Sequence, residues 1–179
     1  LTYEELEEYS NRLAVWIAKN SQDRKRPVIV YGHKNPYMVV CFLACAKAGR
    51  SYVPQDICIP VSRVDETVLS VEPELTFVVE GDYQTEIGTE IGKDEIEEIV
   101  KQETNKTDVL QPLTKDEVWY IIFTSGSTGK PKGVEITRDC LSHYLDWSVQ
   151  LGSTMKEKSG AHFMNQAPFS FDLSVMDLY

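Results

Sequence analysis

The stretch that decides the fold is Ile121-Ile122-Phe123-Thr124-Ser125-Gly126-Ser127-Thr128-Gly129-Lys130-Pro131-Lys132-Gly133-Val134. It begins within a β-branched and aromatic run, Val118 to Phe123, which predicts a buried strand. The chain then enters a loop rich in glycine, hydroxyl residues and lysine. Glycine permits close approach of the backbone to a ligand, and successive N–H groups in such a turn bind anions. The sequence therefore predicts a phosphate-binding loop directly after a buried strand.

The spacing of this loop excludes a P-loop NTPase. That motif needs four residues between its glycines, whereas two separate Gly126 from Gly129, and Pro131 follows Lys130. The segment from Gly88 to Asp94 also departs from the motif, by one residue of spacing and by an aspartate where a hydroxyl is required. For any loop of this composition the alternative is a flexible surface turn.

Composition and charge are those of a globular protein. The 179 residues are 42% hydrophobic and 26% charged, with a net charge of −10. This acidic balance argues against nucleic acid or an anionic membrane as the main partner. No apolar run reaches the roughly 18 residues of a transmembrane helix. Cys41 and Cys45 fit buried free thiols better than metal ligands, so we expect a reducing, cytoplasmic setting and no metal site.

The remaining periodicity predicts an α/β fold, a layered sheet with helices on both faces. Thr2 and Glu5 have capping-box spacing ahead of an amphipathic helix that reaches residue 20. A strand, a buried helix closed by Gly49 and a second strand, within 28–54, predict a βαβ unit with parallel strands. The further elements we expect are a helix over 60–71, a strand over 75–79, a surface helix over 93–102, an edge strand around 109–110, a strand over 133–137 and a helix from 137 onward.

Isolated polar residues carry little further signal. His33, in the turn after the first strand, is expected to be a solvated loop residue, and His143 is expected on the last predicted helix without a catalytic role. The acidic run 94–98 fits a solvated helix face and not a metal site. Near the end of the chain, Ser170 or Asp172 can cap the apolar segment that follows.

Four segments resemble motifs of one family. Position for position, Thr124 to Gly133 resembles the signature loop of the adenylate-forming enzymes, which include acyl-CoA synthetases, luciferases and peptide-synthetase adenylation domains. Leu1–Leu6, Lys47–Pro54 and Phe171–Ser174 are similar to other core motifs of that family, in the same order. The resemblance covers the whole chain. It implies that residues 1–179 form the N-terminal portion of the adenylation domain, with the rest of that large domain and the small lid domain outside them.

The resemblance also implies ATP-dependent activation of a carboxylate, with ATP bound together with Mg²⁺. In the family the signature loop steadies the phosphates by electrostatic positioning. The matching ATP-binding residues are Thr124, Ser125, Gly126, Ser127, Thr128, Gly129, Lys130 and Lys132. The family's catalytic lysine falls outside this sequence, so we expect no catalytic residue within it and no adenylation by residues 1–179 alone.

Asp172 is the residue that bears on the substrate. In amino-acid-activating members the matching aspartate pairs with the substrate's α-ammonium group, because a buried ammonium needs a paired charge. Leu173 and Met176 match positions that line the side-chain pocket. The wording from Asn165 to Asp177 is similar to the branch that charges a phosphopantetheinylated carrier protein with D-alanine for teichoic acid modification. Two alternatives remain: a peptide-synthetase domain for another amino acid, and a non-catalytic nucleotide-binding module.

Overall fold

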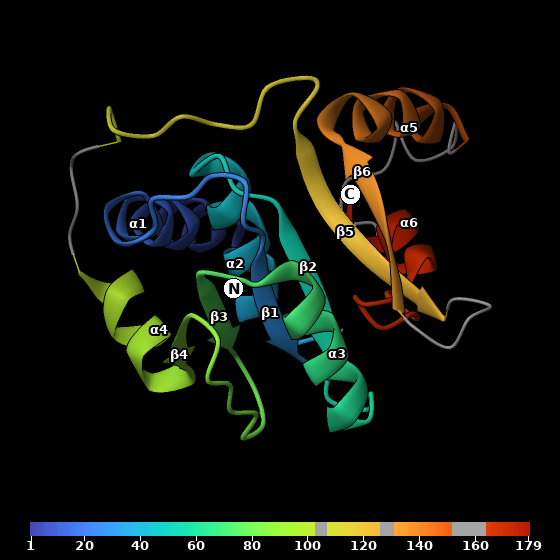
Figure 1. Ribbon diagram of the computed structural model, residues 1–179. Coiled ribbons are helices and arrows are strands. Elements are labelled where there is room, and N and C mark those ends of the chain that lie inside the picture. Colours follow the sequence, from blue (N-terminus) through green and yellow to red (C-terminus); the bar gives the residue numbers. More distant parts are fainter. Residues whose placement is uncertain (103–106, 126–130, 152–163) are drawn as a thin grey trace.

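A single six-stranded sheet organises the chain (Figure 1). The computed structural model describes residues 1–102, 107–125, 131–151 and 164–179. The strands are β1 (Val28–Gly32), β2 (Tyr52–Asp56), β3 (Leu75–Val78), β4 (Thr89–Gly92), β5 (Val118–Ser125) and β6 (Pro131–Thr137). They lie in the order β4-β3-β1-β2-β5-β6. The first five are parallel and β6 is antiparallel to β5, so the predicted α/β class and the parallel βαβ unit are confirmed.

Helices cover both faces of this sheet. They are α1 (Tyr3–Asn20), α2 (Pro36–Lys47), α3 (Val61–Val71), α4 (Lys93–Lys101), α5 (Arg138–Leu151) and α6 (Val175–Leu178), with a 3₁₀ turn, η2 (Asp172–Ser174). One hydrophobic cluster joins α1, α2 and α4 to one face of the sheet, around Phe42 and Phe77. A second cluster joins α3 to the other face through Val64 and Val68. Burial of these apolar stripes on two faces is what holds the layers together.

The ends of the helices follow local chemistry. The Thr2 hydroxyl accepts a hydrogen bond from Glu5 N at 3.1 Å, and Thr2 N donates to Glu5 Oε2 at 2.7 Å, which completes the predicted capping box. Gly49 follows α2 with φ +72°, a left-handed conformation that favours glycine. The start of α1 and the end of α2 therefore lie where their sequence signals predict them.

The segment 164–179 is tied to the sheet by polar contacts at both ends. Lys34 Nζ donates to the backbone oxygens of Asn165 and Gln166 at 3.0 and 2.6 Å. The Tyr179 hydroxyl lies 2.6 Å from the Tyr52 hydroxyl and accepts a hydrogen bond from Trp119 Nε1 at 2.9 Å. Both η2 and α6 therefore lie beside the β5–β6 hairpin, as Figure 1 shows in red and orange.

Three features of the fold differ from the sequence prediction. Residues 109–110 form a turn and not an edge strand, with Val109 exposed. The edge strands are β6 and β4, and β4 lies within the segment considered above only as a failed P-loop. The strand after the signature loop begins at Pro131, two residues earlier than predicted, and it turns back along β5.

Candidate functional site

The β5–β6 hairpin brings the two ends of the signature loop together. Thr124 lies opposite Lys132 and Ser125 opposite Pro131 in the antiparallel register. The Thr124 hydroxyl donates to the backbone oxygen of Lys132 at 3.3 Å, and both residues are exposed. We call these two pairs the hairpin tip. The predicted ATP-binding residues Gly126, Ser127, Thr128, Gly129 and Lys130 lie outside the described residues.

Close approach of the two strands below the tip depends on Gly133. It pairs with Phe123, and a Cβ at this position would lie 2.9 Å from Ile121 Cγ2 and 3.1 Å from Phe123 Cζ. Real Cβ atoms do not come this close to a neighbour without a shift of the chain. The glycine at this position of the motif therefore lets β6 pack against the side chains of β5.

A cavity of ≈ 180 Å³ lies at the hairpin tip. Its lining residues come from β2, the loop after it, α3, both hairpin strands and the segment before η2: Gln55, Ile59, Arg63, Thr67, Phe123, Thr124, Pro131 and Ser170. Strands β2 and β5 are parallel and end at this edge of the sheet. Ligands of open α/β sheets bind outside the carboxyl ends of the strands, so this cavity is the candidate site.

The cavity offers hydrogen-bonding groups and a cation. Among the described lining residues Arg63 is the cation, and its guanidinium lies 3.4 Å from Glu66. Thr67 is bound internally, because its hydroxyl donates to the backbone oxygen of Arg63 at 3.1 Å. Gln55 donates through Nε2 to the backbone oxygen of Pro54 at 2.9 Å. An anionic group in this cavity would therefore face a guanidinium from α3, and Lys132 follows the lining residue Pro131 on β6.

Sequence reasoning missed Arg63 and Gln55 as candidate site residues. Arg63 has the spacing of a polar face on an amphipathic helix, and Gln55 is a buried strand residue. The parallel pairing of β2 with β5 brings Gln55 to the hairpin, and the contact of α3 with β6 brings Arg63 there. No short-range sequence signal marks them, because the contact depends on sheet order.

Asp172 begins η2, two residues after Ser170 of the cavity. The residue is exposed, and its backbone oxygen accepts a hydrogen bond from Val175 N, but its carboxylate forms no hydrogen bond or ion pair with the described part of the chain. Neither Ser170 nor Asp172 caps a helix, so the local capping interpretation is wrong: residue 171 holds the N-cap position of η2, and no side chain caps it. The Asp172 carboxylate is thus left without a structural partner in the described chain.

The other predicted substrate-binding residues are exposed beside it. Leu173 is 57% exposed and Met176 55% exposed, on η2 and α6. None of Asp172, Leu173 and Met176 lines the cavity at the hairpin tip. Their placement in a side-chain pocket therefore stays a prediction.

Three tyrosines lie next to this region, of which Tyr52 and Tyr120 are buried and Tyr179 is half-buried. Burial raises the pKa of Tyr179 to about 12, although its hydrogen bonds with Tyr52 and Trp119 act in the opposite direction. Burial likewise raises the pKa of Tyr120 to about 12, with a smaller contribution from the Asp172 charge. The pKa of Tyr52 is raised well above its ordinary value for the same reason. These phenols are neutral at physiological pH, and the hydrogen bonds of Tyr179 with Tyr52 and Trp119 hold the residue that follows α6 against β2 and β5.

The two predicted loop and helix histidines behave differently. His143 lies on α5 with a 74% exposed side chain, as predicted. His33 is not simply a solvated loop residue. Its side chain is 42% exposed, but Nδ1 lies 2.8 Å from Oδ2 of the buried Asp56. Cys41 and Cys45 are buried free thiols, as predicted, and burial raises the pKa of both.

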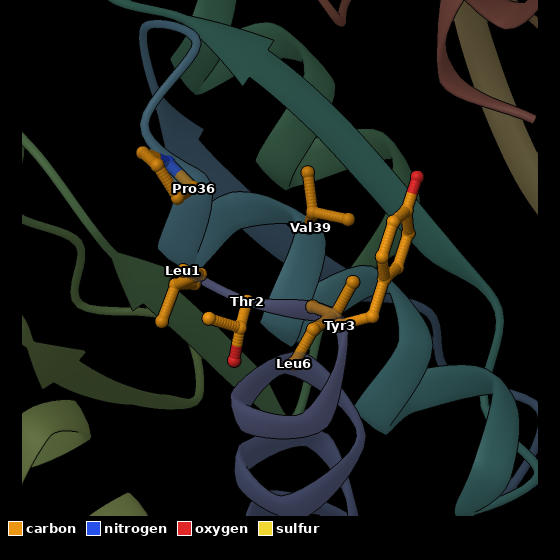
Figure 2. Close-up of a pocket in the computed structure, with 6 residues that line it drawn as sticks. All are labelled: Leu1, Thr2, Tyr3, Leu6, Pro36 and Val39. Atoms are coloured by element: carbon orange, nitrogen blue, oxygen red, sulfur yellow. The ribbon is translucent and has the colours of Figure 1, made fainter. Parts of the chain in front are cut away.

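A second hollow lies at the first turns of α1 and α2 (Figure 2). Its volume is ≈ 360 Å³, and its lining residues are Leu1, Thr2, Tyr3, Leu6, Pro36 and Val39. Figure 2 shows that these side chains are almost entirely apolar, and they include none of the predicted site residues. It offers no group suited to phosphate or ammonium.

Among the described residues no helix combines the length and apolar character needed to cross a membrane.

Comparisons with known proteins place this arrangement in a family. The sequence model of the AMP-binding enzymes matches residues 1–179. The chain is 42% identical over 184 residues to a D-alanine–D-alanyl carrier protein ligase of Bacillus cereus strain AH187, and the match covers 100% of the chain and 35% of that protein. It is 41% identical over 181 residues to the ligase of the same name in Bacillus thuringiensis strain Al Hakam, with the same coverage. The chain thus spans about a third of the length of these curated relatives.

Solved structures agree on the fold. The N-terminal subdomain of Klebsiella oxytoca NpsA in complex with 3-hydroxybenzoyl-AMSN matches with a TM-score of 0.76 and 23% identity, over 99% of this chain and 45% of that one. The four-domain nonribosomal peptide synthetase AB3403, bound to AMP and glycine, matches with a TM-score of 0.75 and 17% identity, over 99% and 13%. With the family model matching from end to end and the sheet shared with adenylation domains, the chain belongs to the AMP-binding enzyme family of adenylate-forming ligases.

Proposed function

We propose that residues 1–179 form the N-terminal portion of the adenylation domain of a D-alanine–carrier protein ligase. Such an enzyme activates D-alanine with ATP as an aminoacyl-adenylate and transfers it to the phosphopantetheine thiol of a carrier protein, for D-alanylation of teichoic acid. The relatives of that name in two Bacillus species support this proposal. The observation that carries it is the Asp172 carboxylate, exposed and without a partner in the described chain, just beyond the cavity at the hairpin tip.

The hairpin tip would hold the phosphates of ATP. Thr124 and Lys132 lie opposite one another at the base of the loop, and Arg63 lines the cavity beside them. When the substrate carboxylate attacks the α-phosphorus, pyrophosphate leaves with additional negative charge. Cations and hydroxyl donors fixed at this place stabilise that charge as it develops. Mg²⁺ accompanies ATP as part of the substrate, and the described lining residues include no carboxylate that would hold it independently.

Asp172 would neutralise the α-ammonium group of the amino acid. An ammonium removed from water needs a paired charge, and a carboxylate provides one. A carboxylate that already capped a helix or paired with a lysine would be poorly suited to this task. Asp172 does neither within the described chain. Leu173 and Met176 then follow on the same short helical segment, where we propose that they contact the substrate's side chain.

The direct test is amino-acid-dependent ATP–pyrophosphate exchange by a full-length enzyme that carries this chain. The panel is D-alanine, L-alanine, glycine, D-serine and a fatty acid. We expect D-alanine to drive exchange. Asp172→Asn should raise the KM for D-alanine strongly and leave the KM for ATP nearly unchanged, because it removes only the charge that faces the ammonium group.

Asp177→Asn is the matched control for this variant. Asp177 lies on the adjoining helix and accepts a hydrogen bond from Gln166 N at 3.0 Å, so it tests local structure without the proposed ammonium contact. Exchange driven by another amino acid would agree with amino-acid adenylation but refute D-alanine as the substrate. That result would favour the alternative of a peptide-synthetase domain. Exchange driven by the fatty acid and unaffected by Asp172→Asn would refute the amino-acid assignment. Absence of exchange with tight ATP binding would favour the non-catalytic module.

The phosphate assignment has a separate test. Lys132→Gln should weaken binding of ATP by the same enzyme about tenfold, because it removes one charge-assisted hydrogen bond to a phosphate. Lys19→Gln, at the exposed end of α1, is the control and should leave binding unchanged. Equal binding by both variants, measured with a fluorescent ATP analogue, would remove Lys132 from the phosphate site.

A further inference from the structure

A second group of reactive side chains lies at the carboxyl ends of β1 and β2. Gly32 pairs with Asp56 at the last register position of the two parallel strands, so His33 and the loop after Asp56 meet at the same edge. There the imidazole of His33, the carboxylate of Asp56 and the thiol of Cys58 place their potential ligand atoms within 4.8 Å of one another. No function described above uses these residues.

The loop around Asp56 is held in this arrangement by hydrogen bonds. Asp56 Oδ1 accepts from Cys58 N at 2.9 Å, and the backbone oxygen of Asp56 accepts from Ile59 N at 3.0 Å. The other carboxylate oxygen lies 2.8 Å from His33 Nδ1. Asp56 is buried, whereas the thiol and the imidazole have access to solvent. The site therefore combines a buried carboxylate, held by hydrogen bonds, with a solvent-accessible imidazole and a solvent-accessible thiol.

The chemistry of this set is that of a borderline divalent cation. Zn²⁺ prefers imidazole nitrogen, thiolate sulfur and carboxylate oxygen at about 2.0–2.3 Å, in a tetrahedral arrangement. Hard cations such as Mg²⁺ or Ca²⁺ prefer six or more oxygen ligands and are poorly matched here. Glu80, whose carboxylate accepts a hydrogen bond from His33 N at 3.3 Å, adds negative charge beside the site.

We propose that His33, Asp56 and Cys58 bind one zinc-like divalent transition-metal ion, with a fourth position open to water. The bound ion would tie the turn after β1 to the loop between β2 and α3. That loop continues into Ile59, which lines the cavity at the hairpin tip, and Gln55 of the same cavity directly precedes Asp56. The ion would therefore stiffen one wall of the candidate nucleotide site. This proposal is independent of the substrate of the enzyme.

The test is titration of the reduced, purified chain with Co²⁺, which is a spectroscopic substitute for Zn²⁺. We expect one equivalent to bind and to produce a thiolate-to-cobalt charge-transfer band in the near ultraviolet, which Zn²⁺ then abolishes by displacement. Cys58→Ser should remove the band. His33→Gln should weaken the apparent affinity at least about tenfold, the scale seen when the surroundings of a metal are altered. Zn²⁺ should raise the Tm of the unmodified chain and not that of Cys58→Ser.

The chain contains a matched control set on α5. Cys140 and His143 are exposed, and His143 Nδ1 lies 4.0 Å from Asp139 Oδ2, but among the described residues only the His33 group converges on a common point. Cys140→Ser and His143→Gln should leave both band and affinity unchanged. The proposal is overturned by a band that persists in Cys58→Ser, by a band that disappears in Cys140→Ser, or by no saturable binding at all. Because Cys58 and His33 lie on separate loops, misfolding of one variant leaves the other to decide.

Discussion

Thr76, on β3, carries a buried hydroxyl that forms no hydrogen bond in the described structure. The residue is 0% exposed, and its Oγ1 has no hydrogen-bond partner in the described structure. A buried hydroxyl without a partner retains its desolvation cost. Thr76→Val keeps the β-branched shape and removes that cost, so we expect the free energy of unfolding to rise by about 1 kcal/mol in urea denaturation.

Thr67→Val provides the contrast for this prediction. Thr67 is equally buried, but its hydroxyl donates to the backbone oxygen of Arg63, so the same replacement should lower stability or leave it unchanged. Destabilisation by Thr76→Val of the size found for Thr67→Val would show that the Thr76 hydroxyl has a partner after all.

At the residue scale, sequence patterns predict burial better than they predict pairing. Cys41 and Cys45 are buried because they recur with helical spacing in an apolar run, which a single sequence displays. The contact between His33 and Asp56 spans 23 positions and depends on the register of β1 against β2. Periodicity places each residue in an element but does not set that register. The partner of His33 was therefore beyond sequence reasoning, as was the placement of Arg63 at the hairpin cavity.

The start of the first helix, α1, in contrast, is predicted by residues that lie next to it in the sequence. The Thr2 hydroxyl accepts a hydrogen bond from Glu5 N, and Thr2 N donates one to the Glu5 carboxylate. This second hydrogen bond lowers the pKa of Glu5. Thr2→Ala should cost about 1 kcal/mol of stability, since it leaves a backbone donor of the first turn without its acceptor. Thr2→Ser retains the hydroxyl and should cost little. Equal losses in the two variants, measured by thermal unfolding, would contradict the capping role.

Strands illustrate where element prediction fails. The parallel strands β1 and β3 are buried, mostly apolar runs, which the sequence displays directly, whereas β2 ends in the buried polar residues Gln55 and Asp56. Strand β4 contains one fully buried apolar residue, Ile91, between Glu90 and Gly92, so it gives no periodic signal. Its pairing with β3 comes from the tertiary structure. The sequence predicts a phosphate-binding loop after a strand and a further strand beyond it. Only the structure shows that this further strand, β6, pairs antiparallel with β5.

For the whole molecule, buried acids set the behaviour at high pH. Cys41 and Cys45 have pKa values raised above their ordinary value of 9.0 by burial, and Tyr52, Tyr120 and Tyr179 have values raised above 10.0. In each case the unfolded chain loses its proton at a lower pH than the folded chain. Their contribution to stability is therefore complete below the unfolded pKa and is lost as pH rises toward the folded one.

Tyr179→Phe isolates one phenol of this group. Between pH 10 and about 12 the folded chain keeps the Tyr179 proton while the unfolded chain releases it, so the free energy of unfolding falls with pH. One retained proton corresponds to a slope of at most about 1.4 kcal/mol per pH unit. The variant should be less stable at neutral pH, because Trp119 Nε1 and the Tyr52 hydroxyl lose their partner, yet its stability should decline less steeply above pH 10. Tyr3→Phe, at a 92% exposed position, should reproduce the slope of the unmodified chain. Parallel declines for all three chains, followed by urea denaturation across this range, would mean that α6 does not shield Tyr179 from water.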